Sequence, residues 1–286
     1  MSPPSTILDA LNDKLSDSTF ERIRTLVKQR SGIDLGDGKR SLVQGRLLRR
    51  LRALSLSTFE EYLPLIEHTG SDESERFMNA LTTNVTEFFR EPHHFELLVK
   101  RVLPDLLVAH ARDRRIRIWS AGCSTGEEPY SLAMVIRETC PVDSWDIKVL
   151  ATDIDSDVLS HAMAGVYPLE RAKRVGQSRL QKHFMCGTGS HAGSVRVRED
   201  VKKLITFKRL NLMEDWPMRG PFDCIFCRNV IIYFDPETRQ RLVTRYAQLL
   251  SADGHLFLGH SESMTGQMTQ FEPCANTVYR KQSGAP

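Results

Sequence analysis

The stretch Arg115-Ile-Arg-Ile-Trp-Ser-Ala-Gly-Cys-Ser-Thr-Gly-Glu-Glu-Pro-Tyr130 decides the fold of this chain. Ile116, Ile118 and Trp119 supply a β-type run, Gly122 and Gly126 permit a tight turn, and apolar residues then recur at helical spacing. Thr125 and Glu128 have the spacing of a capping box at a helix start. The stretch therefore predicts a strand, a glycine turn and a helix, which is the junction where α/β proteins bind ligands.

The next predicted strand, Ile147 to Asp153, ends in an acidic residue. An acid at the tip of the second strand commonly holds the hydroxyl groups of a ribose. Asp155 or Ser156 caps a helix that runs through Ala164 and ends at Gly165, so Asp155 has a structural role of its own. Together the glycine turn and Asp153 predict a pocket for an adenosyl or nucleotide ligand.

Length and composition indicate a soluble, globular protein of about two domains. The chain has 286 residues, of which 41% are hydrophobic and 26% are charged, and it has no apolar run of about 18 residues. The segment Met1-Ser-Pro-Pro-Ser5 lacks the apolar core of a signal peptide, so a cytoplasmic location and six reduced cysteines are expected. The net charge of +3 is too small to indicate nucleic-acid binding.

Residues 1–80 predict a small all-helical domain, because no strand-like run occurs in them. Within it, residues 40–54 form a basic amphipathic helix with a leucine-rich apolar face. Its basic residues are Lys39, Arg40, Arg46, Arg49, Arg50 and Arg52, and no acid interrupts them. This face is either an ordinary solvated surface or an electrostatic docking site for an acidic partner.

Residues 81–95 link the two domains, and within them Asn84, Thr86 and Arg90 offer hydrogen-bonding side chains close together in the sequence. These side chains either cap a helix and pair on the surface or contribute to the active site. The adjacent His93 and His94 lack a nearby pattern of metal ligands, so we interpret them as structural and expect no metal.

Residues 96–286 alternate strands and helices, which predicts an α/β domain with a mostly parallel sheet. At about residues 177–209 the alternation breaks, and a glycine-rich turn with a short alternating strand indicates a small antiparallel insertion. Within it, Val195 and Val197 alternate with Arg196 and Arg198, which predicts a two-faced edge strand. Cys224 and Cys227 match a CxxC pattern of redox or zinc sites, but they lie in a predicted buried strand and are interpreted as core residues.

A nicotinamide dehydrogenase is the first alternative for such a fold. Its GxGxxG fingerprint is absent, since the turn after the first strand contains only Gly122 and Gly126. Asp153 also lies further from this turn than the usual distance of about 20 residues. No phosphate-binding P-loop occurs either. These departures favour an adenosyl ligand without a pyrophosphate, such as S-adenosylmethionine.

Four strings resemble the chemotaxis receptor methyltransferase family, CheR, and the resemblance covers nearly the whole chain. They are Asn79-Ala-Leu-Thr-Thr-Asn-Val-Thr-Glu-Phe-Phe-Arg-Glu91, Trp119-Ser-Ala-Gly-Cys-Ser-Thr-Gly-Glu-Glu-Pro-Tyr-Ser131, Thr152-Asp-Ile-Asp155 and Ile225-Phe-Cys-Arg-Asn-Val-Ile-Ile-Tyr-Phe234. The resemblance implies a Rossmann-like methyltransferase sheet with a small N-terminal helical domain and a small β insertion. It also implies methyl transfer from S-adenosylmethionine to receptor glutamates, giving methyl esters and S-adenosylhomocysteine.

The resemblance assigns roles residue by residue. Arg90 and Tyr233 are the candidates for acting on substrate. The implied cofactor residues are Asn84, Thr86, Arg90, Glu128, Asp153, Asn211, Leu212, Arg228 and Asn229. Glu127 is interpreted as a helix-start acid.

The implied partners are methyl-accepting chemotaxis receptors, with the enzyme recruited as a monomer from the cytoplasm to receptor arrays. Their methylation helices would dock on Arg46, Arg49, Arg50 and Arg52. A C-terminal receptor peptide would pair with the insertion near Gly187, Gly189, Arg196 and Arg198, unless the insertion only blunts a sheet edge. A non-enzymatic receptor adaptor and a nucleic-acid methyltransferase are the alternatives; neither nucleic-acid binding nor membrane insertion is expected.

Overall fold

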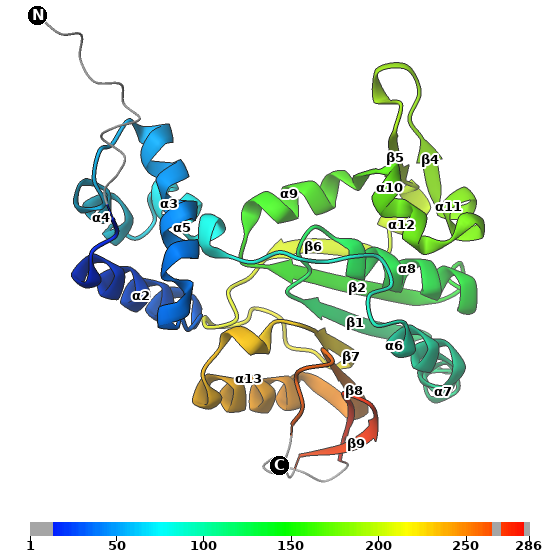
Figure 1. The fold of residues 1–286 in the computed structure, drawn as a ribbon. Helices are drawn as coiled ribbons and strands as arrows, with labels where there is room; N and C mark the ends of the chain where they lie inside the picture. The colour runs from blue at the N-terminus through cyan, green and yellow to red at the C-terminus, as the bar shows by residue number, and fades with distance from the viewer. Residues whose placement is uncertain (1–13, 265–269, 283–286) are drawn as a thin grey trace, which may run out of the picture. The chain divides into compact units, whose positions relative to one another are not determined.

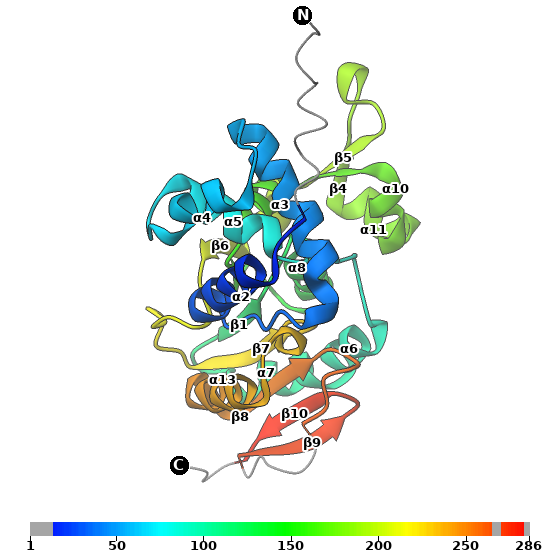
Figure 2. The ribbon, with the colours of Figure 1, turned by 60° about the vertical axis from the view of Figure 1, so that its left-hand side comes forward.

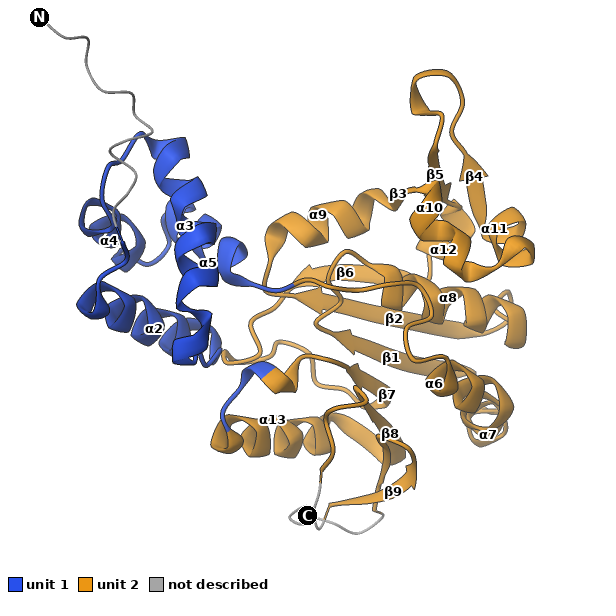
Figure 3. Cartoon of the chain, viewed as in Figure 1, with its two compact units in different colours: residues 1–83, 233–235 blue, residues 84–232, 236–286 orange. Residues whose placement is uncertain are grey.

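The computed structural model describes residues 14–264 and 270–282, and it divides the chain into two compact units (Figure 3). The helical unit comprises residues 1–83 and 233–235, and the sheet unit comprises residues 84–232 and 236–286. Met1 to Ser5, on which the signal-peptide argument depends, lies outside the described residues. Within the described part of the chain, no helix is both long and apolar enough to cross a membrane.

The helical unit is built from amphipathic helices packed around one core. Its elements are α2 (Asp17–Ser31), η1 (Asp37–Lys39), α3 (Arg40–Leu54), α4 (Phe59–Glu67) and α5 (Asp72–Leu81) (Figure 1). The helix predicted at residues 40–54 is confirmed, and it buries Val43, Leu47 and Leu51 in that core. A capping box of Thr58 and Glu61 fixes the start of α4, because each side chain satisfies a free backbone N–H group.

The sheet unit contains a seven-stranded, mostly parallel sheet, which confirms the predicted α/β fold class. Its strands are β1 (Arg115–Ala121), β2 (Asp146–Asp153), β6 (Ile205–Arg209), β7 (Phe222–Cys227), β8 (Leu250–Leu258), β9 (Phe271–Ala275) and β10 (Val278–Lys281). Their order is β6-β2-β1-β7-β8-β10-β9; β10 pairs antiparallel with β8 and with β9, and the other neighbouring strands pair parallel. The carboxyl ends of β1, β2, β6 and β7 therefore meet at one edge.

Helices cover both faces of this sheet (Figure 2). They are α6 (Pro92–Leu97), the π-helical turn η2 (Leu98–Val102), α7 (Leu103–Ala109), α8 (Glu127–Thr139), α9 (Ser156–Ala164) and α13 (Pro236–Leu249). Trp119 of β1 packs on Tyr246 of α13 at 5.4 Å between ring centroids, while Ile118 belongs to the core cluster that includes α8. Since side chains alternate along a strand, these two residues bury opposite faces of β1.

The sequence predictions around the central strands hold with small differences at their ends. Asp155 caps α9 by accepting hydrogen bonds from the backbone of Asp157 and Val158, and Gly165 ends the helix in a left-handed conformation, as predicted. Cys224 and Cys227 are buried in β7, as expected of core residues. Helix α6 starts at Pro92, because proline is suited to the first helical turn.

The insertion forms a separate three-stranded antiparallel sheet of β3 (Val166–Pro168), β5 (Ser194–Val197) and β4 (Phe184–Cys186), in that order. Around it lie α10 (Leu169–Ala172), η3 (Lys173–Val175), α11 (Gln177–His183), η4 (Gly189–His191) and α12 (Glu199–Lys202). The prediction that Val195 and Val197 lie on an edge strand is wrong, because β3 and β4 flank β5 on both sides. This sheet begins at Val166, before the expected boundary of 177, and residues 205–209 are a strand of the large sheet.

Candidate functional site

The predicted glycine turn directly follows β1 at the carboxyl edge of the sheet. The backbone N–H groups of Gly122 and Cys123 donate to the carbonyl oxygen of Thr152, at 2.8 and 2.9 Å, and so join the ends of β1 and β2. Gly122 has φ +89°, and a Cβ atom there would lie 2.4 Å from Cγ2 of Val230. Only glycine fits this position without displacement of Val230, so the backbone at Gly122 can pass close to its neighbours at the carboxyl edge of the sheet.

The predicted capping box at the start of α8 does not form. The N-cap is Gly126, and the Thr125 hydroxyl donates to the Glu127 carboxylate at 2.6 Å instead. Glu128 turns toward the sheet edge, where it accepts hydrogen bonds from Ser120 Oγ at 2.7 Å and Arg228 Nη1 at 3.1 Å. Burial raises the pKa of Glu128, although the Arg228 charge opposes this shift.

Asp153 ends β2 and is buried beside the same turn. Its two carboxylate oxygens accept hydrogen bonds from the backbone N–H groups of Ser124, at 2.8 Å, and Asp155, at 3.0 Å. Burial raises its pKa to about 6 despite these bonds. A carboxylate has about four acceptor positions, so Asp153 retains acceptor capacity for a hydroxyl group of a ligand.

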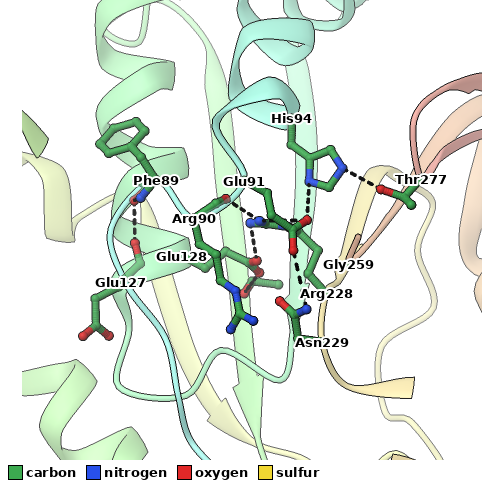
Figure 4. Close-up of polar contacts among 12 residues, drawn as sticks. Phe89, Arg90, Glu91, His94, Glu127, Glu128, Arg228, Asn229, Gly259 and Thr277 are labelled. Atoms are coloured by element: carbon green, nitrogen blue, oxygen red, sulfur yellow. Dashed lines mark hydrogen bonds and ion pairs between the residues drawn. The ribbon is translucent and has the colours of Figure 1, made fainter. Parts of the chain in front are cut away.

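Arg228 follows β7 and contacts both Glu128 and the linking segment, residues 81–95 (Figure 4). Its guanidinium lies 3.4 Å from Oε2 of Glu91 and also donates to the carbonyl oxygen of Arg90. The Glu91 side chain is 10% exposed and pairs with Arg228 and His260, so it is not a surface partner of the adjacent Arg90. Although burial favours its neutral form, these partners bring the pKa of Glu91 down to about 2.

Asn229 lies beside this cluster, in a left-handed conformation with φ +59°. Its side-chain amide donates to Glu91 at 3.5 Å, and its backbone N–H donates to Glu262 at 2.7 Å. Sequence reasoning missed Glu262, a buried carboxylate that also accepts from the backbone of Gly259 at 2.6 Å and Ile232 at 3.2 Å. No local signal marks Glu262, because it lies 33 residues from Asn229 in the sequence.

The predicted site residues of the linking segment, residues 81–95, have different hydrogen-bond partners. Asn84 donates to the Asp155 carboxylate at 2.7 Å, and its carbonyl oxygen accepts from Ser124 Oγ at 3.1 Å, so it lies at the glycine turn. The Arg90 guanidinium donates to the carbonyl oxygen of Val85 at 2.8 Å, within its own loop. Thr86 is half-buried in that loop.

The remaining cofactor candidates follow β6. Asn211 accepts from the backbone of Met213 at 3.0 Å and donates to Glu214 at 3.0 Å, which shapes the turn. Leu212 is buried, and its carbonyl oxygen accepts from Arg245 at 2.7 Å. Both residues thus follow a strand that ends at the same sheet edge as β1 and β2.

The two adjacent histidines have different surroundings. His94 is buried, its Nε2 atom lies 3.0 Å from Thr277 Oγ1, and burial lowers its pKa to about 3, which fits the structural role expected for it. Potential ligand atoms of Glu91, His93 and His94 lie within 4.8 Å of one another. Because Glu91 already pairs with Arg228, we do not propose that these three residues bind a metal ion.

The predicted docking arginines divide into two pairs. Arg46 donates to the carbonyl oxygens of Leu81 and Thr82, and Arg50 forms two hydrogen bonds with the Glu73 carboxylate. These two side chains serve the packing of the helical unit itself. Arg49 and Arg52 are exposed on α3 and remain available to a partner.

The tether candidates lie around the small sheet. Gly187 has no room for a side chain, since a Cβ atom would lie 2.1 Å from the carbonyl oxygen of His191, and Gly189 has φ +58°. Arg196 is exposed on β5 and pairs with Glu199 at 3.3 Å; Arg198 follows β5 and is exposed. With β5 in the centre, an added strand would have to pair with β3 or β4.

Comparison with known proteins identifies the family. Residues 18–82 match the family model of the CheR methyltransferase all-alpha domain, and residues 84–280 match that of the CheR methyltransferase SAM binding domain. The chain belongs to the CheR family. It is 47% identical to the chemotaxis protein methyltransferase of Escherichia coli over 93% of this chain and 91% of that protein.

Two further CheR relatives show similarity of the same extent. Identity to the chemotaxis protein methyltransferase of Salmonella typhimurium is 46%, over 93% of this chain and 90% of that protein. Identity to chemotaxis protein methyltransferase 2 of Pseudomonas aeruginosa is 42%, over 97% of this chain and 98% of that protein. The chain is therefore a chemotaxis methyltransferase with an S-adenosylmethionine-binding domain.

The residues at the sheet edge fit this cofactor chemically. Gly122 lets the backbone approach a ligand, and the Asp153 carboxylate can accept hydrogen bonds from ribose hydroxyls. Glu128 offers a buried carboxylate to a cationic group. The individual cofactor contacts assigned from the sequence stay predictions.

Proposed function

We propose that this chain methylates glutamate side chains of chemotaxis receptors and forms glutamate methyl esters during sensory adaptation. The observation that carries the proposal is similarity over both domains to proteins named chemotaxis methyltransferases. The buried carboxylates Glu128 and Asp153 at the sheet edge support it, because a methyltransferase that had become an idle adaptor would not need them.

The reaction requires no general base, because a glutamate with a pKa of about 4.3 is already ionised near pH 7. When bound, S-adenosylmethionine supplies an electrophilic methyl group and leaves as S-adenosylhomocysteine. The carboxylate oxygen supplies the electron pair of the new carbon–oxygen bond, and the electron pair of the breaking carbon–sulfur bond stays on sulfur. The chain must therefore exclude water and hold the carboxylate near attack distance, about 3–3.5 Å.

In this proposal Arg90 and Tyr233 orient the substrate carboxylate. Arg90 uses one of its five N–H donors on Val85, which steadies the side chain and leaves other donors for a carboxylate. Too tight an ion pair would weaken the nucleophile, so one donor from Arg90 and one hydroxyl from Tyr233 suit the chemistry. Tyr233 lies in the segment 233–235 of the helical unit.

Asn84, Thr86, Glu128, Asp153, Asn211, Leu212, Arg228 and Asn229 are proposed to hold the cofactor. Of these, Arg228 acts through charge balance, since it pairs with the two buried carboxylates of Glu91 and Glu128. Asp153 would accept the ribose hydroxyls, and Glu128 would face the methionine end.

Receptors are proposed to bind at two surfaces. The methylation helices would contact α3 through Arg49 and Arg52, because Arg46 and Arg50 are engaged inside the helical unit. A C-terminal receptor peptide would add a strand beside β4 or β3, held as a tether that raises local receptor concentration to the mM range. Such recruitment would place a monomeric enzyme at membrane receptor arrays.

The test is transfer of labelled methyl groups to receptor-rich membranes, followed by treatment with base. Methyl esters release methanol, whereas methylated bases and amines do not, so the assay separates this proposal from a nucleic-acid methyltransferase. Asp153→Ala should weaken cofactor binding, and Asp146→Ala is its matched control because Asp146 starts the same strand. Absence of base-labile label with active cofactor binding would favour the adaptor alternative.

Tyr233→Phe addresses the substrate role. Loss of the hydroxyl should lower turnover more than cofactor affinity, because the tyrosine is assigned to the carboxylate and not to the cofactor. Equal losses in both quantities, or no loss of turnover, would contradict this division of roles.

A further inference from the structure

The loop of residues 84–91 carries Arg90 and has a backbone that requires support from outside. Phe89 has φ +55° and Glu91 has φ +57°, so left-handed residues flank Arg90 on both sides. Residues other than glycine adopt this conformation at an energetic cost and keep it only where their surroundings enforce it. Contacts made to this loop therefore decide where Arg90 lies.

Arg171, in α10 of the insertion, makes one such contact. Its Nη2 atom donates to the carbonyl oxygen of Thr86 at 3.2 Å and lies 3.0 Å from Oε1 of Glu127. The Glu127 side chain is fully buried at the start of α8. Its ion-pair partner Arg171 is partly exposed and also contacts the loop. Glu127 is thus more than the helix-start acid expected from the sequence.

Two more arginines of the same segment, residues 169–183, contact the next residues of the loop. Arg174 forms an ion pair with Glu87. The guanidinium carbon of Arg179 lies 4.3 Å from the centroid of the Phe89 ring, and its Nε and Nη2 atoms donate to Oε1 and Oε2 of Glu138 of α8 at 3.2 and 2.9 Å. The bidentate pair with Glu138 fixes the plane that stacks on Phe89.

Apolar packing joins the loop to the small sheet as well. The buried Phe88 ring makes edge-to-face contacts with Tyr167 of β3 and Phe184 of β4, at 5.0 and 5.7 Å between centroids. The backbone of Phe89 is held from α8 by Ser131, at 3.0 Å. Each residue from 86 to 89 thus has a partner in the segment of residues 167–184.

We propose that Arg171, Arg174 and Arg179 are positioning residues for methyl transfer. They hold the loop of residues 84–91 so that Arg90 is aimed at the reacting carboxylate and the cofactor-binding residues of the loop stay in place. This inference rests on the proposed function of that loop. A displacement of about 1 Å in a positioning group can lower a rate about a hundredfold, so contacts that never touch substrate matter here.

The experiment compares Arg171→Met, Arg179→Met and their double variant with Lys173→Met in the full chain. Lys173 is the matched control, because it lies in the same segment but pairs with Glu170 instead of the loop. We expect the double variant to lose at least tenfold in kcat for receptor methylation and to bind S-adenosylmethionine more weakly. Backbone amides of residues 84–91 should exchange hydrogen faster, while those of β1 and β2 keep the wild-type rate.

A merely structural role would lower the melting temperature and accelerate exchange throughout the sheet unit. Arg171→Lys keeps the charge opposite Glu127 and should recover part of the lost turnover. If the double variant destabilises the whole unit, Arg174→Met provides the test, since that side chain is 63% exposed and its loss should act on the loop alone. Wild-type turnover and loop exchange in these variants would overturn the proposal.

The same data separate this inference from the proposed function. If wild-type protein fails to methylate receptors, the proposed function fails, and the exchange rates of the loop still show whether the three arginines hold it. If wild-type protein is active and the variants match it in both readouts, the positioning role alone is refuted.

Discussion

Replacing Arg228 with methionine tests the charge balance of the site most directly. The Arg228 side chain is 2% exposed, and it lies 3.1 Å from Glu128 and 3.4 Å from Glu91, whose side chains are 12% and 10% exposed. Methionine replaces the aliphatic stem of the arginine with an unbranched apolar chain but removes the guanidinium cation. The variant therefore leaves two buried carboxylates near each other with no guanidinium between them.

The expected cost follows from this geometry. Removing one partner of a buried ion pair typically costs about 3–5 kcal/mol, because the other charge stays buried without compensation. For a unit of roughly 200 residues, 1 kcal/mol lowers the melting temperature by about 2–4 °C. Arg228→Met should therefore lower the melting temperature of the sheet unit by about 6–20 °C near neutral pH.

The cost should depend on pH with a definite sign. Burial raises the pKa of Glu128, and Arg228 opposes that rise, so the variant carboxyl should take up a proton more readily. A carboxyl whose folded pKa lies above its unfolded value destabilises the fold when ionised. The deficit of the variant should thus shrink as pH falls below the raised pKa and grow as pH rises through it.

Calorimetric melting at pH 5.5 and pH 8 measures both effects. Arg137→Met is the control, because its ion pair with Asp200 is partly exposed and such surface pairs contribute at most about 1 kcal/mol. Adding Glu128→Gln to Arg228→Met removes one uncompensated charge and should restore part of the lost stability. A shift below about 2 °C in Arg228→Met, or no recovery in the double variant, would refute the reasoning.

Three further predictions concern the cofactor turn and the docking helix. Since burial raises the pKa of Asp153 to about 6, and the ionised form accepts ribose hydroxyls, cofactor affinity measured by calorimetry should fall by up to about tenfold per pH unit below pH 6; Asp153→Asn should abolish this dependence, and affinity that rises on acidification would contradict it. Gly122→Ala should lower stability by about 1–3 kcal/mol because of its positive φ and the Cβ contact with Val230, and Val230→Ala should relieve part of that loss in thermal melts; additive losses would exclude the contact as a cause. Arg49→Glu with Arg52→Glu should slow receptor methylation at low salt and less at high salt, because the screening length is about 10 Å at 0.1 M; a normal rate at low salt would return this face of α3 to an ordinary solvated surface.

The sequence by itself determined the elements whose causes are local. The strand before Gly122, the helix that follows it and the cap at Asp155 depend on periodicity, glycine conformation and side chains within a few residues of one another. The basic helix Arg40–Leu54 was predictable for the same reason. Motif resemblance then indicated the family, because several long strings occur in one order.

Tertiary structure alone decided which partner each polar side chain has. Glu128 has the spacing of a capping residue, yet it bonds Arg228, which is 100 residues away. Glu262 reaches Asn229 across 33 residues, and Arg171 reaches Thr86 across 85. Strand order likewise placed β5 in the centre of its sheet, although its alternation of valine and arginine resembles an edge strand. The physical reason is that local spacing sets the period and direction of a side chain, whereas its hydrogen-bond partner depends on which distant segments the packed core brings beside it.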